Sequence, residues 1–530
     1  MPALRNVLPI AAAALALTGA AAAAQISQAE PTPQPPAATP LPEVVVIGTT
    51  PLPGVGIDRD KVPSNASSLL APDTAKQGPA GIGTALDQRL GSVNINANQD
   101  NPFQPDIQYR GFEASPVLGT PIGVAVYQNV VRLNEPFGDN VNWDLVPDFA
   151  INRLSLIPTN PVYGLNGLGG ALVIDMKTGF NFQSGEAKAS GGSFGRRQFT
   201  LQYGKQVGNL AAYIGGNAYN DEGFRNFSPS EVRQLYADIG AEGRAGSLHL
   251  NFTGANNNLI GVGPTPIQLV DIDRSAVFTT PQKFHNTLVM TSLNGNYIAC
   301  DTLSFQSNFY LRSAGRWVFN GNTTDAQPCA DPTLLCLGGA TTPLFDTSGA
   351  RVPSSMLGGG IPGQNDDSSI TSLGLGSSLQ STYTAPLFGR DNHLVVGASF
   401  DHADVDFNST NELGTIDPNT LRVSGLGIII DQPDGSLAPV RLETTTSYYG
   451  LYASDTFDVT PKLAVTVGGR YNIALLHLID KLGTALNGEN RFSRFKCVGR
   501  RDLQDAAQPD GLCRLCRSEP RADRRRDRML

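Results

Sequence analysis

Alternation between apolar and polar side chains is the sequence feature that most restricts the fold. After Gly179, several segments follow a period of two, among them "RRQFTLQYGK", "LSFQSNFYLR" and "PKLAVTVGGRYN". Side chains along a strand point to opposite faces in turn, so each of these segments forms a strand with one apolar and one polar face. In the first segment, one face holds Phe199, Leu201 and Tyr203, and the other holds Gln198, Thr200 and Gln202.

The connections between these strands differ in length. Short ones, such as residues 207–209 and 459–462, alternate with long Asn, Gly, Ser and Pro-rich ones, such as residues 315–369. With 57 Gly, 37 Pro and only 16% charged residues, the chain has a composition typical of a turn-rich, helix-poor protein. Tight turns at one end and long loops at the other are typical of an outer-membrane barrel. A soluble β-sandwich also has alternating strands and stays open as an alternative.

The N-terminus predicts export from the cytoplasm. Residues 1–24 read as a signal peptide, with Arg5, an apolar segment from Leu8 to Leu17, and small residues before Gln25. Residues 25–42 are a Pro-rich linker that cannot form a core. No later stretch approaches the ~18 uninterrupted apolar residues of a membrane-spanning helix, which argues against a helical membrane protein.

Residues 60–179 have a different pattern, which predicts one small α/β domain. "GIGTALDQRL" is a helix candidate, and "GVAVYQNVVRLN" reads as a hairpin that turns near Gln128 and Asn129. "DIQYRGF", "VPDFAINRLSLIP" and "ALVIDMKTG" are strand candidates.

Several separated motifs together resemble one known family. They are "EVVVIG", "DIQYRGF", "VAVYQNVVRLNEPFGDNVNWDLVPDFAINRLSLI", "VYGLNGLGGALVIDMKTG" and "YYGLYASDTFDVTPKLAVTVGGRYN". Their order and spacing over residues 43–490 resemble TonB-dependent outer-membrane receptors. The resemblance implies a mainly β fold, with residues 180–490 as a partial transmembrane antiparallel β-barrel and residues 60–179 as an α/β plug domain in its lumen.

The same resemblance implies a TonB box on the N-terminal arm. An extended segment exposes backbone N–H and C=O groups, so it can add as a strand to the sheet edge of another protein, and a flexible linker lets it reach that partner. An alternative interpretation stays open, in which Val44 to Ile47 form the first strand of the following domain. The residues of the predicted box are Glu43, Val44, Val45, Val46, Ile47 and Gly48.

A plug signature is the second element that the resemblance implies. We expect Gly111 to lie where a side chain would clash or where φ must be positive, and Arg110 to pair with carboxylates of the barrel wall. A surface arginine is the alternative for Arg110. Residues 159–161 read Thr-Asn-Pro where the family commonly has Arg-Gly-Pro. The signature residues are Arg110, Gly111, Phe112, Asn142, Arg153, Gly164, Asn166, Gly169 and Gly170.

Candidate metal and cysteine sites are few. His402, Asp404 and Asp406 share one strand face and could bind a cation, although a solvated acidic wall explains them equally simply. Cys329 and Cys336 enclose six residues and form a possible disulfide in an exported chain. "CRLC", with Cys513 and Cys516, lacks the second ligand pair of a zinc site.

The chain has no "H-E-x-x-H" and no Walker-type motif, so we expect no enzyme and no cofactor. The resemblance implies a receptor that imports a scarce ligand, most often a ferric siderophore, with TonB and outer-membrane lipid as partners and no nucleic acid. An ungated porin-like channel and a secreted β-sandwich binding protein are the alternatives. The sequence does not identify the ligand or a metal site.

The C-terminal segment is atypical. Residues 491–530 hold 12 Lys and Arg against 6 Asp and Glu, so this tail has a net charge of +6 while the rest of the chain has −14. The segment from Phe180 to Glu489 has room for roughly a dozen strands, too few to close a receptor barrel of this family. We therefore expect a truncated or frameshifted receptor with residues 491–530 out of frame. A basic tail that binds lipopolysaccharide phosphate or nucleic acid is the alternative.

Overall fold

The structure is a computed structural model, and its described residues belong to one unit, Val45–Leu530. The predicted signal peptide, the linker and residues 43–45 and 48 of the predicted TonB box lie outside the described residues. The described residues are 46–47, 50, 52, 57–58, 66–71, 81–158, 160–339, 341–460 and 463–503.

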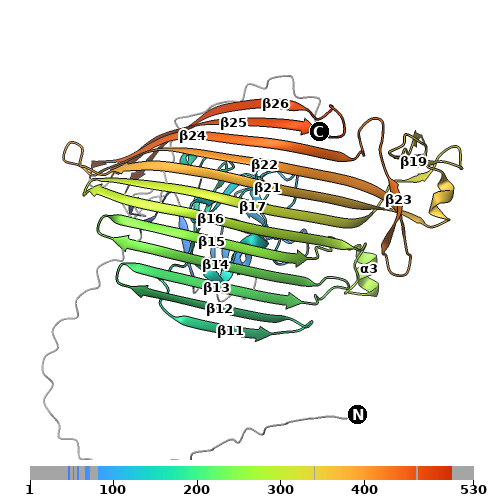
Figure 1. Cartoon of the computed structure of the whole chain (residues 1–530), viewed down its shortest axis with the longest axis horizontal. Helices are drawn as coiled ribbons and strands as arrows, with labels where there is room; N and C mark the ends of the chain where they lie inside the picture. Colours follow the sequence, from blue (N-terminus) through green and yellow to red (C-terminus); the bar gives the residue numbers. More distant parts are fainter. Residues whose placement is uncertain are drawn as a thin grey trace, which may run out of the picture. The chain divides into compact units, whose positions relative to one another are not determined.

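One large antiparallel sheet dominates the fold (Figure 1). Its strands follow the chain order, each paired with the next along the sheet, and β23 (Val423–Ile429) adds to β22 at the side. Among the described residues, β11 and β26 each pair on one side only, so the barrel is open. The strands of the main path are β11 (Gly185–Gly191), β12 (Arg197–Val207), β13 (Leu210–Asp221), β14 (Ser230–Gly243), β15 (Gly246–Leu259), β16 (Gln282–Cys300), β17 (Leu303–Thr323), β21 (Ile361–Tyr383), β22 (Asn392–Ile416), β24 (Val440–Thr460), β25 (Leu463–Asp480) and β26 (Gly488–Leu503).

The two faces of this sheet are the reverse of those in a water-soluble protein. On β12, Leu201 and Tyr203 are 54% and 52% exposed, whereas Gln202 between them is 2% exposed. β17 repeats the pattern, with Phe309 exposed and Gln306 fully buried. An outward apolar face and an inward polar face suit a sheet surrounded by hydrocarbon. A β-sandwich would bury the apolar face instead, so the sandwich alternative is wrong.

The connections confirm short turns at one end of the sheet and long loops at the other. The turn between β12 and β13 is two residues long, whereas residues 260–281 form a loop that holds α3 (Ile267–Ile272). The long loop predicted at 315–369 is shorter in the structure, because β17 continues to Thr323 and β21 begins at Ile361. The interval contains β18 (Gln327–Pro328), β19 (Leu335–Leu337), β20 (Thr342–Pro343) and η5 (Ser354–Leu357).

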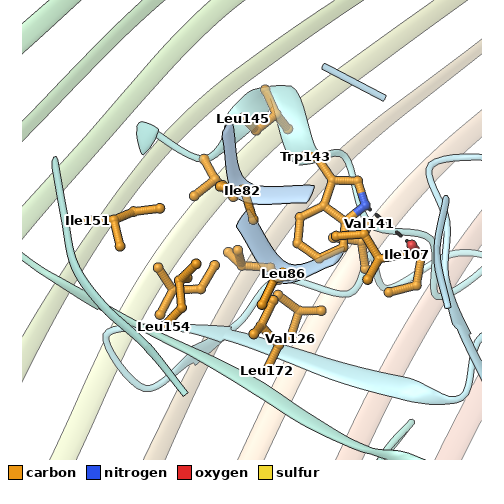
Figure 2. Close-up of a cluster of buried hydrophobic side chains, with 14 of the residues drawn as sticks. Ile82, Leu86, Ile107, Val126, Val141, Trp143, Leu145, Ile151, Leu154 and Leu172 are labelled. Atoms are coloured by element: carbon orange, nitrogen blue, oxygen red, sulfur yellow. Dashed lines mark hydrogen bonds between the residues drawn. The ribbon is translucent and has the colours of Figure 1, made fainter. Parts of the chain in front are cut away.

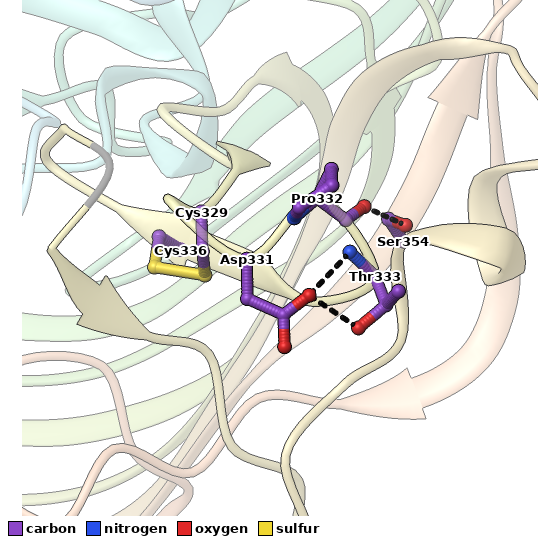
Figure 3. The surroundings of a disulfide bond; sticks show 6 residues. All are labelled: Cys329, Asp331, Pro332, Thr333, Cys336 and Ser354. Atoms are coloured by element: carbon purple, nitrogen blue, oxygen red, sulfur yellow. Dashed lines mark hydrogen bonds between the residues drawn. A yellow bond between two sulfur atoms is a disulfide. The ribbon is translucent and has the colours of Figure 1, made fainter.

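A disulfide between Cys329 and Cys336 lies in this loop, with the two Cα atoms 5.1 Å apart (Figure 3). Inside the closed ring, the Asp331 carboxylate accepts hydrogen bonds from the Thr333 backbone N–H (3.0 Å) and hydroxyl (2.7 Å). The Ser354 hydroxyl donates to the Pro332 carbonyl at 2.6 Å, which joins the ring to η5. Covalent and polar contacts therefore fix a loop that has few residues of regular structure.

The N-terminal domain packs against the inward face of the sheet. Its helix α2 and hairpin β7–β8 agree with the predicted ones, and no helix of the described residues is long and apolar enough to cross a membrane. Its elements are α2 (Gly81–Arg89), a five-stranded sheet of β3 (Ser67–Leu70), β9 (Ile151–Pro158), β10 (Gly170–Met176), β7 (Val124–Gln128) and β8 (Val131–Arg132), a three-stranded sheet of β4 (Val93–Asn96), β5 (Asp106–Tyr109) and β6 (Phe112–Ala114), and the short helices η2 (Trp143–Leu145), η3 (Asp148–Ala150) and η4 (Pro161–Tyr163).

The core of this domain, called the plug below, is apolar (Figure 2). Leu86 of α2 lies next to Val126 and Leu172 of the five-stranded sheet, and Ile82 lies on the side of Leu145 and Trp143 of η2. The indole N–H of Trp143 donates to the Ala114 carbonyl at 3.3 Å, which gives its buried polar atom a partner. The same cluster continues to Tyr213, Tyr236 and Leu288 of the large sheet, so plug and wall share part of their core.

Two predicted boundaries are partly described. Val46 and Ile47 form β1 (Val46–Ile47), which pairs antiparallel with β2 (Ile57–Asp58). This pairing is compatible with a TonB box and with a first strand of the plug, so both interpretations stay open. The predicted boundary at residue 490 falls within β26, which pairs with β25 as far as Leu503, and residues 504–530 lie outside the described residues.

Candidate functional site at the interface of plug and wall

A buried ion pair joins the plug to β17. Arg312 Nη1 lies 2.8 Å from Glu135 Oε2, and Arg312 Nη2 lies 2.6 Å from Glu135 Oε1. The side chains are only 8% and 9% exposed. Asn142, a predicted signature residue, donates its Nδ2–H to Glu135 Oε1 at 3.0 Å and thereby orients the carboxylate. Two parallel charge-assisted hydrogen bonds give this contact a fixed register as well as strength.

We call this ion pair the first clamp between plug and wall. A second clamp, made of hydrogen bonds, surrounds Asp144 in η2. Its carboxylate accepts hydrogen bonds from Asn257 Nδ2 of β15 and Asn286 Nδ2 of β16, both at 2.9 Å. Gln234 of β14 donates to the backbone carbonyls of Asp144 at 2.7 Å and Val146 at 3.0 Å. Burial raises the pKa of Asp144 to about 6, although both asparagines and the nearby Arg316 favour the charged form. Two neighbouring strands thus hold the buried carboxyl group through neutral amides, and Gln234 of a third strand holds the adjacent backbone.

The turn of the β7–β8 hairpin makes a third set of contacts. Gln128 donates to the Thr253 hydroxyl, and Asn129 donates to the Tyr236 hydroxyl, each at 2.8 Å. Asn129 also accepts the Met176 N–H at 2.9 Å. Asn129 has a positive φ of 43°, which Asn adopts more readily than most residues. The predicted turn at Gln128 and Asn129 therefore also attaches the plug to the wall.

Two arginines lie where the plug meets β24 and β25. Arg132 Nη1 donates to Asn166 Oδ1 at 2.8 Å and lies 3.5 Å from Asp139 Oδ1. Arg470 donates from Nη1 to the Val162 carbonyl at 3.1 Å, and from Nε to Asn472 Oδ1 at 2.7 Å. Each guanidinium also faces a tyrosine ring, Tyr448 for Arg132 and Tyr452 for Arg470. These contacts lie beside a small cavity, in which about 40 Å³ is open to the centre of a water molecule.

The structure corrects the expected role of Arg110. Arg110 and Gly111 form the two-residue turn between β5 and β6, with φ angles of 52° and 82°. The Arg110 guanidinium is exposed and lies over the Tyr109 ring at 5.1 Å, and no carboxylate of the described residues pairs with it. An ion pair between plug and wall does exist, but the wall supplies the arginine, Arg312, and the plug supplies the carboxylate, Glu135.

Phe112 depends on the glycines of the predicted signature. A Cβ atom at Gly169 would lie 2.5 Å from the Phe112 ring, and one at Gly123 would lie equally close. A Cβ atom at Gly170 would lie 2.6 Å from the Ile157 carbonyl oxygen. These separations are too short for any side chain, so the glycines allow the ring and the strands to approach closely.

The turn at residues 164–166 supports both arginines. Gly164 has a φ of +77°, and a Cβ atom there would lie 3.0 Å from Arg470 Cζ. Asn166 has a φ of 59° and accepts the hydrogen bond from Arg132. Both residues were predicted for their turn chemistry. The structure adds that this turn holds a plug arginine and a wall arginine in place.

Two other sets of predicted residues lie away from this interface. Arg153 pairs with Asp175 across β9 and β10 within the plug, at 2.8 Å. His402, Asp404 and Asp406 do share one face of β22, but His402 bonds to the Ser447 hydroxyl at 2.9 Å and Asp404 to the Thr445 hydroxyl at 2.9 Å. The described residues contain no group of three His, Cys, Asp or Glu that could hold a metal ion.

The residues that form the two clamps were not predicted, apart from Asn142. Asp144 lies 142 residues before Asn286, and Glu135 lies 177 residues before Arg312. Alternation gives little signal at these positions, because Asn257 lies between two asparagines and Asn286 lies between His285 and Thr287.

No protein-family model and no curated protein matches the chain. Solved structures do match. The ferric citrate transporter FecA, unliganded, aligns with a TM-score of 0.62 and 11% identity over 86% of this chain and 62% of its own. The ferric yersiniabactin uptake receptor FyuA from Yersinia pestis gives 0.57 and 12% over 83% and 62%. BauA, the ferric preacinetobactin receptor from Acinetobacter baumannii, gives 0.59 and 12% over 86% and 63%.

This likeness establishes the fold. The chain shares the fold of these three proteins, its N-terminal plug packs on the inward face of an antiparallel wall of strands, and the predicted fold class is confirmed. The chain spans 62% or 63% of the length of these three proteins.

Proposed function

We propose that this chain is an outer-membrane receptor that binds a ferric siderophore or a similar scarce ligand and imports it by TonB-driven movement of the plug. The observation that carries the proposal is the sheet itself, with Leu201 exposed outward and Gln202 buried inward, wrapped around a plug held by polar clamps. Hydrocarbon stabilises such an outer face, and the clamps can break and re-form in water because every group in them is polar.

The proposal includes a location and a partner. The predicted signal peptide and the outward apolar face favour the bacterial outer membrane. The segment from Glu43 to Gly48 is the proposed attachment point for TonB, because an extended strand on a Pro-rich arm can pair with a partner's sheet edge. Named relatives of the same fold are transporters and receptors of ferric siderophores or ferric citrate, which supports a transport role rather than an enzymatic one.

Uptake of radioactive iron tests this function directly. Cells that lack their own receptors would express the chain and be offered a panel of ferric siderophores, with and without an intact tonB gene. We expect one ferric chelate to enter only when TonB is present. Uptake that continues without TonB, together with free ion conductance in a bilayer, would instead indicate the ungated channel.

Two deletions of equal length give the matched control. Removing Glu43–Gly48 should abolish uptake while surface binding of the ferric chelate persists, whereas removing residues 34–39 of the linker should leave uptake nearly unchanged. Equal uptake by the two variants would contradict the TonB-box assignment and favour the interpretation of Val46 and Ile47 as a strand of the plug. The nucleotide sequence around codon 496 tests the frame hypothesis for the C-terminal segment.

A further inference from the structure

The cavity beside Arg132 and Arg470 has an unusual lining. It lies between the β7–β8 hairpin of the plug and the inward faces of β17, β22, β24 and β25. Five tyrosines contribute to it, and Tyr310 donates its hydroxyl to Asp401 at 2.7 Å. Aromatic rings and guanidinium groups together form a surface that attracts anions while remaining partly apolar. The tyrosines are Tyr127, Tyr310, Tyr448, Tyr449 and Tyr452.

Arg470 is the group that points to a ligand. Its side chain is buried, and its hydrogen-bond acceptors are all neutral: the Val162 carbonyl, Asn472 Oδ1 and, at 2.5 Å, the Ser399 hydroxyl. No carboxylate of the described residues forms an ion pair with it. Removing a cation from water without an opposite charge is costly, so a purely structural role would be served better by a neutral side chain.

The surroundings of Arg470 are shaped to keep the guanidinium in this position. A Cβ atom at Gly450 on β24 would overlap Arg470 Nη2, and one at Gly164 in the plug would press on Cζ. Two glycines from different parts of the chain therefore make room for it. Lys496 adds a further cation nearby, with Nζ 3.3 Å from the Gly164 carbonyl.

The charges that face the cavity leave positive charge uncompensated. Arg132 has Asp139 as its ion-pair partner, and Asp401 accepts the hydroxyl of Tyr310. Arg470 and Lys496 have only neutral acceptors among their hydrogen bonds. Asp401 is the one carboxylate among the described residues that line the cavity, and it acts on both Arg132 and Arg470, so a negatively charged group in the cavity would balance the second cation.

We propose that this cavity is an inner anion-binding site, which takes a carboxylate group of the cargo as it passes between plug and wall. The identity of the occupant rests on the proposed transport function, whereas binding of an anion does not. Because the site uses one arginine from the plug and one from the wall, movement of the plug would separate the two guanidinium groups and release the anion.

Binding of malonate, a small dicarboxylate, tests the site on the purified chain in detergent. The measurement is the broadening of the ¹³C malonate NMR signal at constant ionic strength. We expect wild-type protein to broaden the signal, and Arg470→Met to weaken apparent affinity by about tenfold or more, the effect of losing one charge-assisted contact. Arg233→Met is the matched control, because Arg233 lies on the outward side of β14 and pairs with Glu231 at 2.6 Å.

A second variant separates loss of the site from loss of the fold. Gly450→Ala keeps the positive charge but displaces the Arg470 guanidinium, so malonate binding should fall as it does in Arg470→Met. Absence of binding to the wild type, or equal binding by wild type, Arg470→Met and Gly450→Ala, would overturn the proposal. Neither TonB nor an energised membrane is present in this test, so failure of iron uptake and failure of this site are distinguishable.

Discussion

The plug and the wall bury opposite kinds of side chain. In the plug, Leu86 is 1% exposed within an apolar core, whereas in the wall Gln306 is fully buried and Leu201 is 54% exposed. The plug follows the ordinary rule for a domain in water. The wall follows the rule for a sheet with hydrocarbon outside and a polar lumen inside. Burial alone therefore does not identify a core, because the medium on each side of an element decides which face is apolar.

The interface between these regions is held by polar contacts at its clamps. Glu135, Asp144 and Asn129 of the plug all meet polar groups of the wall. Water can satisfy each of these groups when plug and wall separate, whereas an apolar interface would lose its stabilisation outright. A plug that stays docked at rest and yields to a pulling force needs this kind of contact.

Arg312→Met should have the largest effect, because it leaves the buried Glu135 carboxylate without its cation. We expect a loss of about 3–5 kcal/mol in the free energy of unfolding. Guanidinium unfolding of the purified protein measures it, and Glu135→Gln combined with Arg312→Met should recover a large part. Arg110→Met is the control, with a change of about 0.5 kcal/mol or less since Arg110 is exposed. Equal effects of the two arginine substitutions would show that the clamp does not hold the plug.

Leucine truncation tests the contrast between the two apolar environments. Leu86→Ala opens a cavity in a packed core and should cost about 2–5 kcal/mol. Leu201→Ala faces outward, where lipid or detergent fills the vacated space, so only the transfer free energy is lost, about 1–2 kcal/mol. Guanidinium titration of both variants in one lipid or detergent gives the comparison. Equal costs would mean that the outward face is packed against protein.

The strands of the wall could be predicted from sequence because alternation is a local property. Alternation over five consecutive positions predicts one apolar face with Phe199, Leu201 and Tyr203, and all three side chains are exposed in the structure. Whether this apolar face is exposed or buried could not be predicted from the segment, because the same residues would also suit the buried face of a sandwich. The exposure of the apolar face and the position of the plug on the polar face decided between the two folds.

The candidate site was harder to predict for the same reason. Gly111 and Asn166 were predicted correctly as turn residues, because a positive φ is a property of the residue and its neighbours. The partners of Asp144 and Glu135 lie more than a hundred residues away, and nothing in the neighbouring sequence specifies them. Arg110 was assigned the clamp role that Arg312 has, because residue type indicates a possible ion pair but not the direction of the side chain.

The buried carboxyl group of Asp144 predicts a dependence of the free energy of unfolding on pH. Its pKa, raised by burial to about 6, exceeds the ordinary value of 3.8, so the native state binds the proton more tightly than the unfolded state. The favourable contribution is complete below about pH 4 and is lost as pH rises through about 6, with a total change of about 3 kcal/mol. Asp144→Asn should remove this slope.

The difference between wild type and Asp144→Asn isolates this carboxyl group from all others that titrate. Melting temperatures of both proteins between pH 4 and 7 should converge or cross, with the variant relatively more stable at pH 7. The Asn side chain keeps an oxygen that accepts the hydrogen bond from Asn286, but its NH₂ group faces the NH₂ group of Asn257. This contact between two donors reduces the stability that the variant gains at pH 7. Parallel curves over this range would show that Asp144 is not held in the protonated form.

Glycine substitutions should have the smallest effect on the free energy of unfolding, and they compare a turn of the plug with a strand of the wall. Gly111 has open space around its Cβ position, so Gly111→Ala is strained only by the φ of +82°, and we expect a loss of about 1 kcal/mol. Gly216 in β13 has no positive φ, and a Cβ atom there would lie 3.7 Å from the Gln234 carbonyl oxygen, an ordinary contact. Gly216→Ala should therefore be neutral or stabilising by a few tenths of a kcal/mol, because alanine reduces the entropy of the unfolded chain. Chemical unfolding of both variants measures the difference, and a larger cost at Gly216 than at Gly111 would mean that the wall, rather than the plug turn, has the more demanding backbone.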